Sequence, residues 1–162
     1  MSVPMGYSRR QIGLHWLVAL ILVPQFFLHD DIKAAWRAIR KGLDYNHTTW
    51  VTFHVYAGIV ILALMLWRLS IRVMRGVPRP PEEESAMMKM VATGTHWLLY
   101  LLLILLPITG LMSWFGGIGS AAEIHEAMKL PLFALVGLHI LGALYQQFVL
   151  RTNILARMKR AG

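Results

Sequence analysis

The chain contains no cysteine. Disulfides, iron–sulfur clusters, thiolate zinc sites and c-type haem, whose attachment needs a Cys-x-x-Cys-His motif, are therefore all excluded. Any redox cofactor must be held without covalent bonds, by histidine or methionine. The ten methionines show no fixed spacing from the histidines, so we expect most of them to be flexible packing residues.

Charged side chains are scarce as well. They make up 15% of the 162 residues, and 57% of the residues are hydrophobic, whereas a soluble domain has about 25% charged residues. Four segments contain no Asp, Glu, Lys or Arg: residues 12–28, 51–67, 90–115 and 130–150. A transmembrane helix needs about 20 such residues, and no glycine-rich phosphate loop interrupts the segments. The sequence therefore predicts an all-α bundle of four transmembrane helices that forms a single domain over residues 1–162.

The basic residues are distributed unevenly between the two predicted sides of the membrane. The side with both termini and the connection 75–85 holds eleven: Arg9, Arg10, Arg68, Arg72, Arg75, Arg79, Lys89, Arg151, Arg157, Lys159 and Arg160. The opposite side holds five: Lys33, Arg37, Arg40, Lys41 and Lys129. This bias predicts cytoplasmic termini. The basic pI of about 10.3 then reflects topology, and we expect lipid and no nucleic acid as a partner.

The first apolar segment resembles a signal peptide, because Arg9 and Arg10 precede it. It is not followed by a small-x-small cleavage site, so we expect it to be retained as the first span. After it, apolar residues recur at spacings of three and four over residues 32–43, with basic residues mostly elsewhere on the helical wheel. This pattern predicts a short amphipathic helix at the periplasmic membrane face. Its cations can either steer a small anion or anchor to lipid headgroups: Lys33, Arg37, Arg40 and Lys41.

Four histidines lie in or beside the apolar segments: His15, His54, His125 and His139. His125 and His139 are fourteen residues apart, which is about 21 Å of helix and within about 40° of the same face. His15 and His54 lie near the starts of antiparallel segments, so one is expected at each depth. A lone histidine in such a segment is more often a packing residue, but four at two matched depths favour a functional role.

Neutral imidazole is the usual axial ligand of low-spin haem iron. The pattern therefore predicts two non-covalent b-type haems, an inner one on His15 and His139 and an outer one on His54 and His125. Gly58 and Gly142 share the faces of His54 and His139, where a missing side chain makes room for a porphyrin. Close helix packing explains these two glycines equally well.

The assignment depends on where the last helix begins. Ser120 followed by Glu123 is a capping-box pattern, which predicts a start at Ser120, places His125 in the second turn and leaves Pro131 inside the helix. If the helix began at Pro131 instead, His125 would lie in a loop.

His96 is a rival ligand. It could pair with His15, so that His54 and His139 share the outer haem and His125 is spare. The fourteen-residue spacing favours the first pairing. We therefore expect His96 to form a hydrogen bond with a haem propionate or a quinone, and Arg9 or Arg10 to join His96 if the ligand is a quinone.

The segments that carry these histidines resemble the bacterial cytochrome b561 family. They are Tyr7-Ser8-Arg9-Arg10-Gln11-Ile12 with His15-Trp16, Phe53-His54-Val55-Tyr56-Ala57-Gly58, Leu106-Pro107-Ile108-Thr109-Gly110, and His125-Glu126 through Gly137-Leu138-His139. The resemblance covers almost the whole chain and extends to the cytochrome b subunits of formate dehydrogenase and nickel–iron hydrogenase. In those relatives the first helix pairs with the inner histidine of the last helix, and the second helix with the outer.

The resemblance implies a multi-pass cytochrome b of the bacterial inner membrane. The best-understood of the short four-helix members takes electrons from periplasmic superoxide and reduces ubiquinone, so the resemblance implies a superoxide:quinone oxidoreductase. An electron-transfer subunit that docks a periplasmic protein donor is the alternative, and a purely structural membrane protein is a third class. Related sequences often carry a His-His pair where this chain has Gln146-Gln147.

Overall fold

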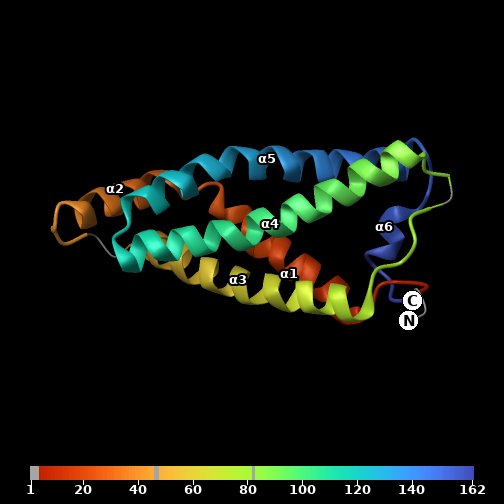
Figure 1. Cartoon of the computed structure of the whole chain (residues 1–162), viewed down its shortest axis with the longest axis horizontal. Helices are drawn as coiled ribbons and strands as arrows, with labels where there is room; N and C mark the ends of the chain where they lie inside the picture. Colours follow the sequence, from red (N-terminus) through yellow and green to blue (C-terminus); the bar gives the residue numbers. More distant parts are fainter. Residues whose placement is uncertain (1–3, 46–47, 82) are drawn as a thin grey trace.

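The computed structural model describes residues 4–45, 48–81 and 83–162, which form helices and their connections. The order along the described chain is α1 (Arg9–Gln25), α2 (His29–Arg40), α3 (Thr49–Arg75), α4 (Ala86–Gly116), α5 (Gly119–Phe148) and α6 (Ile154–Arg157). Figure 1 shows the four long helices running along the molecule. The predicted all-helical fold is therefore confirmed for these residues.

Three of the long helices begin at side chains that cap them. Ser8 and Gln11 form a capping box at the start of α1, Thr48 accepts a hydrogen bond from the backbone of α3, and Ser85 does the same for α4. Such caps satisfy backbone N–H groups that have no partner within the helix. As a result α1 begins at Arg9, three residues before the predicted apolar run.

The start of α5 corrects one prediction and confirms another. The N-cap is Ile118 rather than Ser120, because the left-handed backbone of Gly117, with φ +65°, turns the chain directly into the next helix. The predicted capping box at Ser120 is therefore wrong. The longer helix is nevertheless correct, since α5 contains His125 and has Pro131 in its interior.

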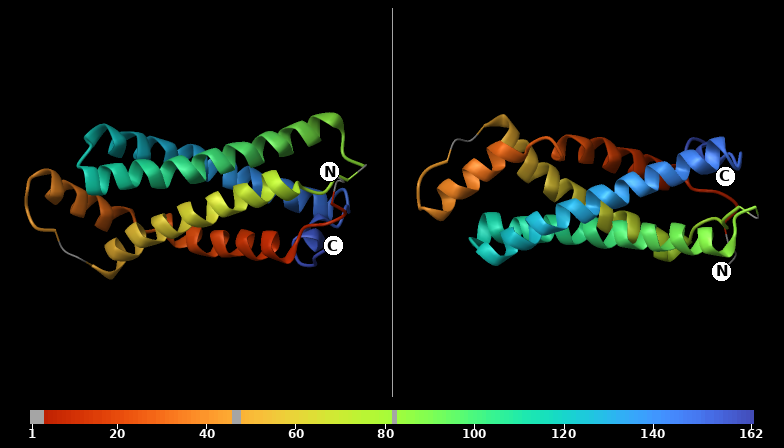
Figure 2. Two further views of the ribbon diagram at one scale, coloured as in Figure 1. Left: turned by 60° about the horizontal axis from the view of Figure 1, so that its bottom comes forward. Right: turned by 90° about the horizontal axis from the view of Figure 1, so that it is seen from above.

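The helices pack in sequence, α1 on α3, α3 on α4 and α4 on α5. Residues 4–8, 76–81 and 83–85, together with α6 and the C-terminus, lie at one end of the bundle, whereas α2 and the α4–α5 turn lie at the other (Figures 1 and 2). Among the described residues α3, α4 and α5 are long and apolar enough to cross a membrane. Since α1 has 17 residues, the fourth span stays a prediction.

The amphipathic segment forms α2, which ends at Arg40 rather than at the predicted residue 43. Ala35 is buried and Trp36 is half-buried, while Lys33 and Arg37 are exposed. The apolar face of α2 is thus directed at the bundle, where the helix packs against α3.

The buried core lies midway along the bundle. It includes Val18 of α1, Ile61 of α3, Leu103 of α4 and Leu132 of α5. Many large apolar side chains elsewhere are exposed, for example Leu141 at 65%. A small core with an apolar exterior suits a bundle surrounded by lipid.

Candidate functional site

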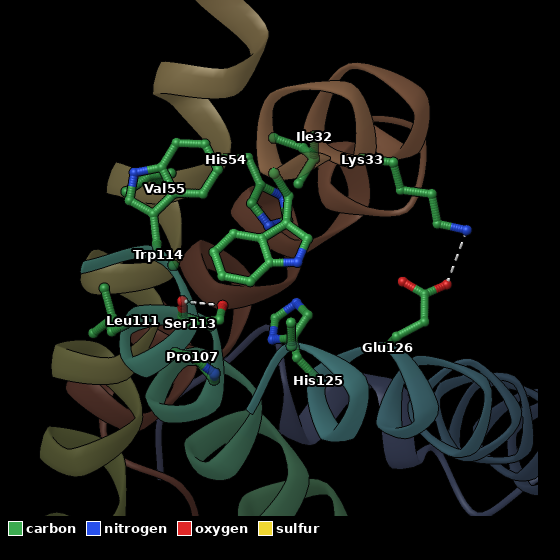
Figure 3. A pocket seen from close by; sticks show the side chains of 14 residues that line it. Ile32, Lys33, His54, Val55, Pro107, Leu111, Ser113, Trp114, His125 and Glu126 are labelled. Carbon is green, nitrogen blue, oxygen red and sulfur yellow. Dashed lines mark hydrogen bonds and ion pairs between the residues drawn. The ribbon is translucent and has the colours of Figure 1, made fainter. Parts of the chain in front are cut away.

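The outer pair, His54 and His125, lies near the α2 end of the bundle. The two ring centroids are 6.2 Å apart and the rings are inclined at 74°. A cavity of about 110 Å³ adjoins them and is lined by residues of α2, α3, α4 and α5, among them Trp36, Gly58 and Trp114. Figure 3 shows both imidazoles directed toward this cavity.

The sequence Leu106-Pro107-Ile108-Thr109-Gly110 of α4 holds His125 in place. The Nδ1 of His125 lies 2.8 Å from the carbonyl oxygen of Leu106. Because a carbonyl only accepts, Nδ1 carries the proton in this contact, which leaves Nε2 free to bind a metal. Gly110 permits the approach, since a Cβ there would lie 3.1 Å from two atoms of the His125 ring.

His54 lacks the equivalent contact. Its Nδ1 is buried without a hydrogen-bond partner among the described residues, and leaving a buried polar group unpaired costs about 1–3 kcal/mol. A Cβ added at Gly58, one turn further along α3, would meet no atom within 4 Å. The region around His54 therefore combines an unsatisfied nitrogen with open space.

The inner pair, His15 and His139, lies toward the end with the termini. Its ring centroids are 6.0 Å apart, with the planes at 70°. His96 of α4 also contacts His139, at 5.2 Å between centroids. The structure thus brings together both histidine pairs predicted from the spacing. The rival pairing would need His54 beside His139, whereas His54 lies beside His125.

These separations can be compared with those expected for a metal centre. A nitrogen lies about 1.1 Å from the centre of an imidazole ring with bonds of about 1.33 Å, and histidine binds metals at about 2.0–2.1 Å. Two imidazoles on opposite sides of one metal ion therefore have centroids about 6.2 Å apart. Both pairs match this value, while the 5.2 Å separation of His96 and His139 is too short.

The arrangement of donors also bears on the kind of metal centre. No cluster of three or more His, Cys, Asp or Glu ligands occurs within the described parts of the chain. A haem iron needs only two axial protein ligands, because the porphyrin supplies the others. Each histidine pair also joins helices that are not among the closely packed neighbours, α1 with α5 and α3 with α5. The residues present therefore fit haem, although the ligation itself stays a prediction.

A cationic cluster near the inner pair was not singled out from the sequence as a site. Arg68 lies over the ring of Tyr100 at 5.7 Å, and Arg72 lies over Trp97 at 4.9 Å and over Tyr100 at 5.4 Å. Arg68 is close enough to His15 and His139 to interact with them electrostatically. It lies fourteen residues after His54 on α3, a spacing that could have revealed it.

The predicted anion-steering residues on α2 divide into two groups. The Nζ of Lys33 lies 3.4 Å from Glu126 Oε1, and Lys129 Nζ lies 2.7 Å from Glu126 Oε2, so Lys33 links α2 to the helix that carries His125. Figure 3 shows the Lys33–Glu126 pair beside the cavity. The remaining cations, Arg37, Arg40 and Lys41, are exposed at the molecular surface.

The predicted quinone residues are not gathered in one place. His96 lies in the interior beside His139, whereas Arg9 and Arg10 are exposed in the first turn of α1. The two glutamines near the end of α5 also differ. Gln147 holds the α6 turn through Asn153 and the backbone of Leu155, while Oε1 of Gln146 is buried without a partner among the described residues.

Comparison with known proteins gives the family. The model of the prokaryotic cytochrome b561 family matches residues 6–161, so the chain belongs to this family. Cytochrome b562 of Cereibacter sphaeroides is 34% identical over 158 residues, covering 96% of each chain. A probable superoxide oxidase, CybB, of Yersinia pestis is 33% identical over 176 aligned residues, covering 94% of each chain. The protein is accordingly an integral membrane b-type cytochrome that binds haem b and transfers electrons.

Proposed function

We propose that the protein carries two non-covalent b-type haems and transfers electrons from periplasmic superoxide to membrane quinone. The inner pair, His15 and His139, holds one haem and the outer pair, His54 and His125, holds the other. The proposed topology places α1, α3, α4 and α5 across the bacterial inner membrane, with both termini in the cytoplasm and α2 at the periplasmic face.

The observation that carries this proposal is the separation within each pair. Centroid distances of 6.0 and 6.2 Å agree with two axial imidazoles on one iron, and fourteen residues of α5 place the two layers about 21 Å apart. Haem b supplies a one-electron carrier when bound. If both histidines of a pair bind the iron, no position would remain open for oxygen, so the bound haem would supply outer-sphere electron transfer.

The relative named as a probable superoxide oxidase supports superoxide as the donor. Two superoxide anions each lose one electron and become dioxygen, while one quinone takes up the two electrons and two protons and becomes a quinol. Arg37, Arg40 and Lys41 on α2 attract the anion over about a Debye length, ~10 Å at 0.1 M salt. We place ubiquinone at the cytoplasmic side, near His96; Arg9 and Arg10, exposed in the first turn of α1, lie outside this site.

Haem analysis of the purified protein tests the ligation. We expect two haems per chain, loss of the same outer haem from His54→Ala and His125→Ala, and loss of the inner haem from His15→Ala and His139→Ala. The His96→Ala protein is the matched control and should keep both haems. Loss of a haem from that variant, together with full occupancy in His125→Ala, would contradict the pairing.

Stopped-flow reduction by superoxide, with quinone present, tests the donor. Reduction should be fast at low ionic strength and slow down as salt is added, and replacing Arg37, Arg40 and Lys41 with glutamine should lower the rate while both haems remain bound.

One observation favours the second candidate, an electron-transfer subunit with a protein donor. Lys33 is engaged with Glu126, which weakens the positive field of α2. A slow, salt-independent reaction that the three substitutions leave unchanged would support that candidate.

A further inference from the structure

The strongest feature that the proposed function leaves unexplained is the arginine cluster, which we define as Arg68, Arg72, Trp97 and Tyr100. The two guanidinium groups lie on successive turns of α3, both within 6 Å of the Tyr100 ring centroid. Tyr100 is buried at 9% exposure, and both arginines are half-buried. The cluster therefore holds two permanent positive charges against the interior of the bundle.

Two like charges in this position need a negative partner. Cations four residues apart on a helix repel each other, and charges within the membrane region are costly unless they are paired. Within the described residues neither arginine forms an ion pair, since the carboxylate pairs there involve Lys33 and Lys129. The aromatic contacts stabilise each cation but supply no negative charge.

The position of the cluster identifies the partner. Both arginines lie over Tyr100, which is one turn after His96 on α4, and His96 contacts His139 of the inner pair. Both also interact electrostatically with His96, and Arg68 with His15 and His139, so the cluster adjoins the inner pair. Arg72 lies four residues, about 6 Å along α3, nearer the end with the termini. A ligand with two carboxylates, bound at the inner pair and extending toward that end, would meet both guanidinium groups.

We propose that Arg68 and Arg72 bind the two propionate carboxylates of the haem held by His15 and His139. This inference rests on the proposed function, because it assumes a haem at the inner pair. The planar guanidinium group matches a carboxylate through two parallel hydrogen bonds, and haem b carries two carboxylates for two arginines. A quinone is neutral and would leave both charges uncompensated.

Tyr7 belongs to the same neighbourhood. Burial raises the pKa of Tyr7 above its ordinary value, although the nearby Arg72, Arg157 and Arg68 oppose this rise. The hydroxyl group therefore keeps its proton at neutral pH and can donate a hydrogen bond to a carboxylate. This segment also fixes the end of the bundle, since the backbone N–H of Gly162 donates to the carbonyl of Tyr7.

Spectroelectrochemical titration of Arg68→Gln and Arg72→Gln tests the inference on the haem-loaded protein. Removing a cation near an iron disfavours the reduced form, so the midpoint potential of the inner haem should fall. A tenfold change in the relative affinity for oxidised and reduced haem corresponds to about 59 mV for one electron. Transfer of the inner haem to apomyoglobin should become at least tenfold faster. The outer haem should keep its potential and its transfer rate.

Two comparisons separate a carboxylate contact from a merely structural role. Arg79→Gln, in the exposed connection after α3, is the matched control and should leave both haems unchanged. Arg68→Lys and Arg72→Lys retain the charge without the paired hydrogen bonds, so they should give intermediate rates. Loading with haem dimethyl ester, which has no free carboxylates, should abolish the difference in transfer rate between the arginine variants and the parent protein.

The outcomes of this experiment are distinguishable. Unchanged inner potential and transfer rate in both glutamine variants, with two haems bound, would overturn the inference and leave the proposed function intact. An arginine dependence that persists with haem dimethyl ester would also overturn it. A parent protein that retains no haem at the inner pair would remove both the inference and the proposed function.

Discussion

Replacing Gly110 with alanine should weaken the outer haem selectively. The added Cβ would lie 3.1 Å from both Cε1 and Nδ1 of His125, closer than ordinary contact, so the ring must retreat by a few tenths of an ångström. This movement lengthens the 2.8 Å hydrogen bond to Leu106. Such a bond contributes about 0.5–1.5 kcal/mol, and a loss of 1.4 kcal/mol corresponds to about tenfold in affinity. We expect the outer haem to bind about tenfold more weakly.

Haem titration of the apoprotein, followed by potentiometry of the two haems, measures this effect. Gly94→Ala provides the control on the same helix, because a Cβ at Gly94 would meet no atom within 4 Å. It introduces the same methyl group into α4 without contacting His125. Equal outer-haem affinities in the two variants would refute the role assigned to Gly110. A weaker inner haem in Gly110→Ala would refute the assignment of His125 to the outer haem.

Three other predictions follow from the same geometry. Glu126→Gln should break the links to Lys33 and Lys129. Because such half-exposed pairs contribute about 0.2–1 kcal/mol each, the fold should persist while amide hydrogen exchange in α2 becomes faster. Unchanged exchange would show that apolar packing alone holds α2. Gly58→Leu should lower the occupancy of the outer haem, and Gly142→Leu should lower the occupancy of the inner haem, because both positions have open space that the larger side chain would fill. Neither variant should lose helical circular dichroism. Full occupancy would show that the haems do not use that space. Reporter fusions at Gly162 and within α2 should read cytoplasmic and periplasmic respectively, and the reverse result would invert the topology.

The sequence predicted the long helices but not their full lengths. Runs without charged residues locate hydrocarbon-spanning segments, whereas a helix continues as far as its backbone is capped. For this reason α3 extends past residue 67 to Arg75, and α4 begins at Ala86, after the cap at Ser85. The capping box at Ser8 and Gln11 was present in the sequence and would have given the start of α1. The short helix α6 has no apolar periodicity of its own and was not predicted.

The candidate site, like the helices, could be predicted from the sequence only in part. The spacing along the last helix predicted that His125 and His139 share a face. The antiparallel direction of the first two segments then predicted their partners, and the structure has His54 beside His125 and His15 beside His139. The contact of His125 with Leu106 depends on how α4 packs against α5, so helical periodicity alone could not give it. Arg68 was counted only toward topology, although its distance from His54 equals that between the two histidines of α5.

The shared spacing of α3 and α5 explains how the bundle keeps two polar layers apart. On α3 the sequence His54, Ile61, Arg68 advances by seven residues at each step, and on α5 His125, Leu132, His139 does the same. A seven-residue repeat drifts by only about 20° per step on a straight helix, so each helix presents a polar, an apolar and a polar residue on nearly one face. Ile61 and Leu132 both belong to the buried core. The core therefore lies between the histidine layers, and the separation of about 21 Å is set by the rise of the helices rather than by any contact between the layers.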